Sequence, residues 1–174
     1  MSKSVKDTAK KLDIQQIYLS ASSSAFHNDF DSSIPNQLLT GQFVINTIKV
    51  ETTTVSDGET NTSNRFLRCY IQAGMRYILG EPTDEELGSD EWVKSNIASE
   101  ISAIYCVQYA IRPGAEISDE EKEEFGKVNA SYHVWPYWRE YAQNTCNRMN
   151  LPVSTVPMLI IEPTPKKEEP PQES

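Results

Sequence analysis

No run of 18 or more apolar residues occurs in this 174-residue chain, so no segment is predicted to cross a membrane as a helix. The lysine-containing start, MSKSVKDTAKKLD, also lacks the apolar segment of a secretory signal. Basic charge is scarce as well: 16 Lys and Arg stand against 25 Asp and Glu, which argues against the basic surface that nucleic acids require. We therefore expect a cytoplasmic protein that neither inserts into membranes nor binds nucleic acid.

Motifs for metal binding and catalysis are missing too. The cysteines Cys69, Cys106 and Cys146 form no CxxC pair and have no histidine at metal-ligand spacing, so we expect reduced, packed thiols, no metal and no cofactor. There is no glycine-rich phosphate loop and no GxSxG motif. His27 lies in a polar loop, and His133 has no visible third group for an acid–base site. The sequence predicts a protein that is not an enzyme.

The negative charge is concentrated in two stretches. Residues 81–95 and 116–124 each contain six acidic residues and one lysine, so together they carry −10, while the rest of the chain is close to neutral. Both contain a Thr or Ser followed by three acids, which is typical of a helix start, and we expect short helices near 83–94 and at about 118–127. The acids keep the surface soluble, and a recognition role for them stays open.

Four segments are predicted as strands. The first, from Ile14 to Phe26, is weakly patterned, and the second, residues 42–55, is rich in β-branched residues and ends at a hairpin signal. The third and fourth are the clearest, because alternate positions over 67–79 and 97–111 are apolar. Strands of about 15 residues would span roughly 50 Å, far beyond the usual five or six residues.

Strands this long need more cover than one helix supplies. A single chain would leave apolar surface exposed, and such surfaces mark association or binding sites. Assembly into a symmetric oligomer is the simplest remedy. The residues that we expect on the face of the sheet used for packing or assembly are Ile71, Met75, Tyr77, Ile101, Tyr105, Val107 and Tyr109.

The stretch from Tyr132 to Met158 predicts the main helix and two apolar-Pro steps after it. Pro136 suits a first helical turn, where no N–H is needed. An apolar stripe at helical spacing is formed by Val134, Trp138, Tyr141, Thr145 and Met149. Residues 1–12 are expected to be a flexible tail and the Pro/Glu-rich residues 162–174 to be disordered, which leaves one folded unit at 13–161.

The residues Pro136-Tyr137-x-Arg139-Glu140, followed by the apolar-Pro steps, resemble the C-terminal part of the SecB family of export chaperones. The resemblance covers about 13–161 and includes Ile17-Tyr18 in the first strand. It implies an α+β fold, a four-stranded antiparallel sheet with a long C-terminal helix packed on it, assembled as a dimer of dimers. It also implies ATP-independent binding of unfolded or nascent polypeptides in grooves, for which the candidate residues are Tyr132, Trp135, Tyr137, Trp138, Tyr141, Met149, Leu151, Val153, Val156 and Met158.

The chain departs from the export type in ways that argue against SecA docking. Residues 19–25 read LSASSSA, without the carboxylates that follow Ile-Tyr in those chaperones, and no acid lies between Glu100 and Glu116. The acidic connector 113–131 is closer to the SecB-like chaperones of toxin–antitoxin systems. Two alternatives stay open: a dedicated chaperone for one client such as an antitoxin, and an oligomeric scaffold or small-ligand carrier that uses the space between sheet and helix.

Overall fold

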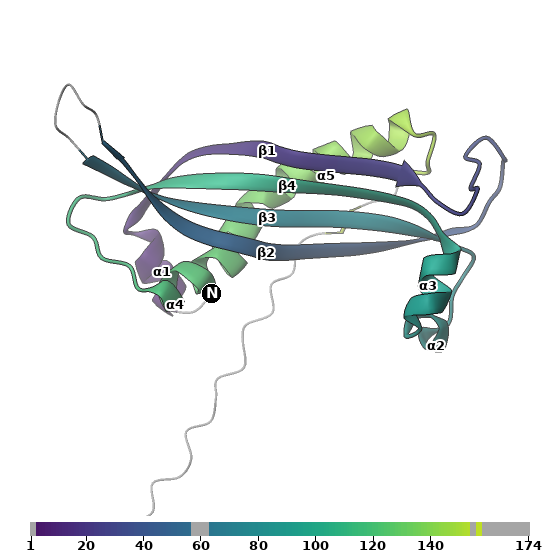
Figure 1. The fold of residues 1–174 in the computed structure, drawn as a ribbon, viewed down its shortest axis with the longest axis horizontal. Coiled ribbons are helices and arrows are strands. Elements are labelled where there is room, and N and C mark those ends of the chain that lie inside the picture. Colours follow the sequence, from purple (N-terminus) through teal and green to yellow (C-terminus); the bar gives the residue numbers. More distant parts are fainter. Residues whose placement is uncertain (1–2, 57–62, 154–155, 158–174) are drawn as a thin grey trace, which may run out of the picture.

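A long four-stranded antiparallel sheet forms the body of the molecule (Figure 1). The computed structural model describes residues 3–56, 63–153 and 156–157. The strands are β1 (Leu12–Phe26), β2 (Leu39–Ser56), β3 (Ser63–Leu79) and β4 (Ile97–Ile111), in the order β1-β4-β3-β2. The predicted α+β class and all four strands are confirmed, and β4 has the predicted limits.

The central strands have one face that is fully buried. On β3, Leu67, Cys69 and Ile71 are buried, while the intervening Arg68 and Tyr70 are half-buried. Antiparallel register sets each buried residue of β3 against one of β4, as in the pair Ile71 and Tyr105. This alternation follows from the two-residue period of a strand, which sends successive side chains to opposite faces.

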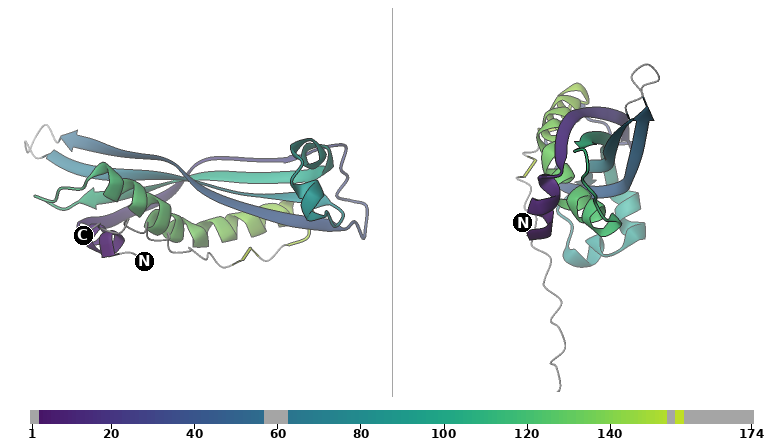
Figure 2. Two further views of the ribbon diagram at one scale, coloured as in Figure 1. Left: turned by 90° about the horizontal axis from the view of Figure 1, so that it is seen from below. Right: turned by 90° about the vertical axis from the view of Figure 1, so that its left-hand side faces the viewer.

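One helical segment covers the buried face (Figure 2). It begins with α4 (Asp119–Phe125), continues through the π-helical turn η1 (Gly126–Ala130) and ends with α5 (Ser131–Arg148). The opposite face, which we call the open face, is covered only at one end, where α3 (Asp90–Asn96) packs Val93 against Ile78 and Ile97. The short helix α2 (Asp84–Leu87) precedes α3, so two helices stand where the sequence predicts one near 83–94, and α2 has the predicted acidic first turn after Thr83.

The apolar stripe of the main helix differs from the prediction. Its buried positions are Ser131, Val134, Trp135, Trp138, Ala142 and Cys146, whereas Tyr141, Thr145 and Met149 are only half-buried. The prediction placed mainly the large side chains of the helix on its buried face. The small residues Ala142 and Cys146 face the sheet instead, since they let the helix backbone approach it closely.

Pro136 also has a different place from the one predicted. It is the sixth residue of α5, inside the helix, because the helical chain already begins in α4. A proline there removes one helical hydrogen bond, from its own position to the carbonyl of Tyr132. Pro136 and Tyr132 are both exposed, so water can bond that carbonyl.

The N-terminal residues are not the tail that the sequence predicts. They contain helix α1 (Lys3–Ala9), in which Val5 and Thr8 are buried, and strand β1 follows directly at Leu12. The Lys11 ammonium group lies 2.8 Å from a carboxylate oxygen of Glu121, which ties this end of the chain to α4. The second strand likewise begins earlier than expected, at Leu39. Residues 162–174 lie outside the described part of the chain.

The π-helical turn depends on a glycine. A Cβ atom at Gly126 would lie 2.8 Å from Val50 Cγ2 and 3.3 Å from Thr47 Cγ2, so the helix approaches β2 as closely as a residue without a side chain allows. We expect Gly126→Ala to lower the free energy of unfolding by about 1–3 kcal/mol through this overlap. Urea denaturation measures the change, and Lys127→Ala, at the exposed next position, serves as the control. Equal stability of both variants would contradict the packing role of Gly126.

Candidate functional site

The ten predicted groove residues do not line one surface. Trp135, Trp138, Leu151 and Val156 are buried in the core, Tyr141 and Met149 are half-buried, and Met158 lies outside the described residues. Only three, Tyr132, Tyr137 and Val153, are exposed. Of the motif residues, Pro136 and Glu140 are also exposed and Arg139 is half-buried.

The apolar-Pro steps close the core after α5. The indole N–H of Trp135 donates to the carbonyl oxygen of Pro157 over 2.9 Å, and the hydroxyl of Tyr77 donates to the carbonyl oxygen of Pro152. Leu151 and Val156 are buried on the same segment. These contacts hold the segment against both the helix and the sheet, which explains why most of the C-terminal aromatic and apolar residues are structural.

The seven residues predicted on the packing or assembly face of the sheet are all at most 4% exposed within the single chain. They are Ile71, Met75, Tyr77, Ile101, Tyr105, Val107 and Tyr109. The helical segment covers them, so within the single chain these seven residues serve packing. Among the described residues, the edges of the sheet, its open face and the exposed side of α5 are what a second copy can contact.

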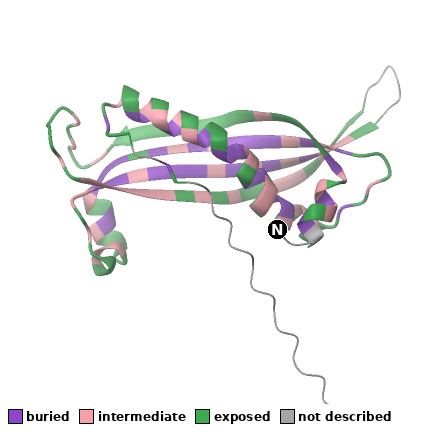
Figure 3. Cartoon of the chain, turned by 180° about the vertical axis from the view of Figure 1, so that it is seen from behind, coloured by how far each residue is buried: buried purple, intermediate pink, exposed green. Residues whose placement is uncertain are grey.

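Strand β1 and helix α5 both carry exposed apolar residues, and Figure 3 shows strand β1 exposed (green) along most of its length. Ile14 and Leu19 are 49% and 44% exposed, and they pair in register with Tyr109 and Tyr105 of β4. Tyr105 in turn donates its hydroxyl to the backbone oxygen of Tyr137 in α5 over 3.3 Å. Leu19 therefore pairs with the strand residue that is bonded to the backbone of Tyr137.

The same relation holds one helical turn earlier. The hydroxyl of Tyr109 is 2.8 Å from Nδ1 of His133, and Tyr132, the residue before it, is 64% exposed. We call the set Ile14, Leu19, Tyr132 and Tyr137 the β1–α5 surface. The sequence indicated the two tyrosines, but not Ile14 and Leu19. Two register shifts, between Ile14 and Gln16 and between Leu19 and Ala21, break the alternation that would have marked them.

Strand β1 also lies at an edge of the sheet. Among the described strands it pairs only with β4, and it is exposed along most of its length. A strand edge presents backbone N–H and C=O groups that can pair with another extended chain. The β1–α5 surface thus combines exposed apolar side chains with unpaired backbone groups.

The titratable groups near this surface are held neutral by burial. Burial raises the pKa of Tyr105 to about 12, raises that of Tyr109 further, and lowers the pKa of His133. The same cause raises the pKa of the Cys69 thiol to about 12. All three cysteines are free and buried, as predicted. These pKa directions describe packed structural groups, not an activated nucleophile or base.

The part of the chain that the structure describes contains no cluster of three or more His, Cys, Asp or Glu side chains that could hold a metal ion. None of its described helices is long and apolar enough to span a membrane.

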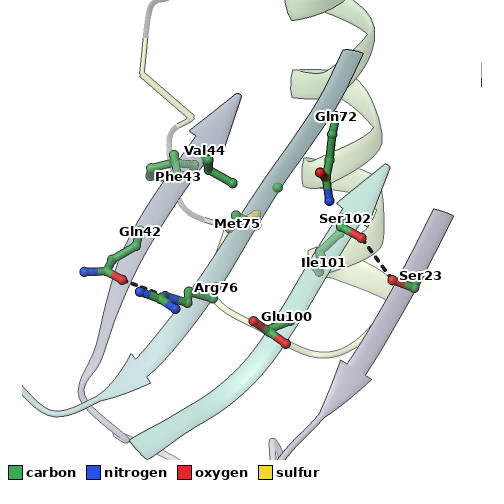
Figure 4. Close-up of a pocket in the computed structure, with 11 residues that line it drawn as sticks. Ser23, Gln42, Phe43, Val44, Gln72, Met75, Arg76, Glu100, Ile101 and Ser102 are labelled. Carbon is green, nitrogen blue, oxygen red and sulfur yellow. Dashed lines mark hydrogen bonds between the residues drawn. The ribbon is translucent and has the colours of Figure 1, made fainter. Parts of the chain in front are cut away.

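A hollow of about 770 Å³ lies on the open face (Figure 4). Its polar lining consists of Ser23, Gln42, Gln72, Arg76, Glu100 and Ser102. This position does not fit a carrier that holds its ligand between sheet and helix, where the buried side chains of β3, β4 and α5 form the core.

A β1-β4-β3-β2 antiparallel sheet with one long C-terminal helix across one face is a SecB-like fold, and the resemblance seen in the sequence is confirmed at this level. One solved structure with this fold is the SecB-like chaperone of Mycobacterium tuberculosis in complex with a ChAD peptide from the HigA1 antitoxin. The match has a TM-score of 0.62 at 16% sequence identity and covers 92% of this chain and 99% of that one. No family model and no curated protein sequence matches the chain.

The structure places Trp135 in the core and not on an exposed groove, because the residue is only 8% exposed and its indole N–H is bonded to the carbonyl oxygen of Pro157. We expect Trp135→Ala to destabilise the fold by about 3–5 kcal/mol, as for other buried aromatic residues. Trp135→Phe keeps most of the ring and loses the hydrogen bond, so it should cost about 1 kcal/mol on that account, plus some lost packing. Chemical denaturation gives both values. An unchanged melt for Trp135→Ala would contradict its place in the core.

Proposed function

We propose that this protein is a cytoplasmic chaperone that binds unfolded polypeptides, without ATP, at the β1–α5 surface. The observation that carries the proposal is that β1 (Ile14, Leu19) and α5 (Tyr132, Tyr137) both carry exposed apolar residues, and that β1 is an edge strand with no second partner among the described residues. Exposed apolar surface of this kind marks a binding site for another chain.

The chemistry of the surface suits an extended client of variable sequence. Backbone groups of the client can pair with the free edge of β1, an interaction that does not depend on side chains. Its apolar side chains can contact Leu19 and Ile14, while the rings of Tyr132 and Tyr137 offer both an apolar body and a polar hydroxyl. In a folded protein most backbone groups are already paired and most large apolar side chains are buried. The surface therefore selects the unfolded state.

A dedicated chaperone for one client is the second candidate. It is supported by the similar SecB-like chaperone, which was captured with a peptide from an antitoxin. The absence of carboxylates over 19–25 favours this candidate over protein export, since that segment would have to dock SecA. Measurable binding of SecA by this chain would restore the export role.

We further propose that the chain forms a homo-oligomer, a dimer of dimers. Edge strands are the usual place for such pairing, and β2 is the second edge strand of the described sheet, apart from the β1 edge that we assign to the client. Light scattering coupled to size-exclusion chromatography should give a mass of four 19.7-kDa chains. A monomer at all concentrations would contradict the assembly.

Size-exclusion chromatography with light scattering also tests the proposed chaperone activity. We expect the protein to co-elute with a reduced, permanently unfolded polypeptide and to ignore the folded, oxidised form of that polypeptide. The double variant Leu19→Asp, Tyr137→Asp should bind the unfolded chain at least about tenfold more weakly, because each change places a charge at an exposed apolar position of the β1–α5 surface. The matched control is Ile34→Asp, on an exposed loop residue away from the surface.

The outcomes separate the candidates. A general chaperone binds several unrelated unfolded chains, a dedicated chaperone binds one, and a scaffold or small-ligand carrier binds none. Equal loss of binding in Ile34→Asp and in the double variant, or no loss in either, would remove the β1–α5 surface as the site.

A further inference from the structure

A small exposed apolar ridge lies on the first half of helix α5. Tyr132 is 64% exposed, and Pro136, four residues later and therefore its neighbour on the helix surface, is exposed as well. Trp135 lies between them in the sequence, but its ring is in the core. We call Tyr132 and Pro136 the α5 ridge.

The ridge also carries a backbone acceptor that the helix does not use. In a regular helix the N–H of residue 136 would donate to the carbonyl oxygen of Tyr132, but proline has no N–H. Because both residues are exposed, an N–H from another segment of chain can reach this oxygen in place of water. The ridge thus offers two apolar rings and one backbone acceptor to an extended segment.

The chain itself returns to this ridge after α5 ends. The N–H of Leu151 donates to the carbonyl oxygen of Cys146 over 2.9 Å, and the carbonyl oxygen of Pro157 accepts from the indole N–H of Trp135 over 2.9 Å. Positions 146 and 135 are separated by about 16 Å of helix rise. The chain therefore runs back along α5, antiparallel to it, and the buried Val156 holds it there. Pro157 ends up within one helical turn of the ridge.

The residues that follow Pro157 are apolar. Met158, Leu159, Ile160 and Ile161 are four large apolar residues in a row, and residues 162–174 contain no large apolar residue. Four residues span up to about 13 Å, whereas Tyr132 precedes Trp135 by about 4.5 Å of helix rise. The ridge is therefore within reach of residues 158–161, and contact between the two removes apolar surface of both from water.

We propose that residues 158–161 dock on the α5 ridge of their own chain and compete there with the client. A backbone N–H of the segment donates to the carbonyl oxygen of Tyr132, and its apolar side chains contact the rings of Tyr132 and Pro136. The competition rests on the proposed function, because Tyr132 belongs to the β1–α5 surface. The other three members of that surface stay accessible, so the segment lowers the affinity for a client and does not abolish it.

Disulfide formation within the full-length protein tests the docking without a client. The pair Tyr132→Cys, Ile160→Cys should oxidise at least about tenfold faster than the pair Tyr137→Cys, Ile160→Cys, because proximity sets the effective concentration of the second thiol. Tyr137 is the matched control: it is also an exposed tyrosine near Trp135, but it lies about 140° around the helix from Tyr132. The native cysteines are buried and react slowly. Mass spectrometry of the digested protein identifies and times each bond.

The competition is tested with the reduced, permanently unfolded polypeptide. The double variant Leu159→Asp, Ile161→Asp should bind it about three- to tenfold more tightly than the unchanged protein, because an occupied site lowers the apparent affinity by the fraction of molecules that are open. The matched control is Thr164→Asp, Gln172→Asp, which adds the same charge at polar positions of the following stretch. It should leave the affinity unchanged.

Three results would overturn the proposal. One is equal oxidation of the two cysteine pairs. Another is equal affinity of the two aspartate variants for the unfolded polypeptide. The third is a disulfide that joins two differently tagged chains, which would make a second copy the source of the docked segment. The oxidation rates need no client, so they stand if the chaperone proposal fails. Client binding by the unchanged protein, together with equal oxidation, would remove this proposal alone.

Discussion

The packing of α5 on the buried face of β3 and β4 is the interaction on which the rest of the structure depends. Trp138, Val134 and Ala142 of the helix meet an uninterrupted row of buried strand residues, and burial of each large side chain contributes about 1.5–3 kcal/mol. One helix cannot cover strands of 15 to 18 residues in a four-stranded sheet. The path of the helix leaves β1 exposed. The β1–α5 surface lies where the helix stops covering the sheet.

The two faces of the sheet consequently differ in chemistry. On the helix side, apolar residues such as Leu19 and Tyr137 are exposed beside polar ones such as Glu140 and Arg148. On the open side, two half-buried arginines stand opposite carboxylates, Arg68 opposite Glu51 and Arg76 opposite Glu100, and the hollow has a mixed polar and apolar lining.

The sequence predicted the sheet well and the N-terminal residues and the start of the main helix poorly. Strand β4 was predicted residue for residue, because the alternation of apolar and polar side chains follows directly from strand geometry. Residues 3–9 were missed because α1 is short and is stabilised by contacts with α4, which come from a distant part of the sequence. Pro136 was misplaced for a related reason: the helix begins before it, in α4 and η1, so that the proline falls inside.

The amino-acid sequence by itself determined the strands, the main helix, the concentration of acids in two stretches and the resemblance to the SecB family, since these depend on local periodicity and on residue order. The tertiary structure decided which apolar residues are available. Trp135 and Tyr137 are two residues apart and equally aromatic, yet one is 8% and the other 50% exposed. The direction in which α5 crosses the sheet makes that difference, as it also leaves Leu19 exposed on β1.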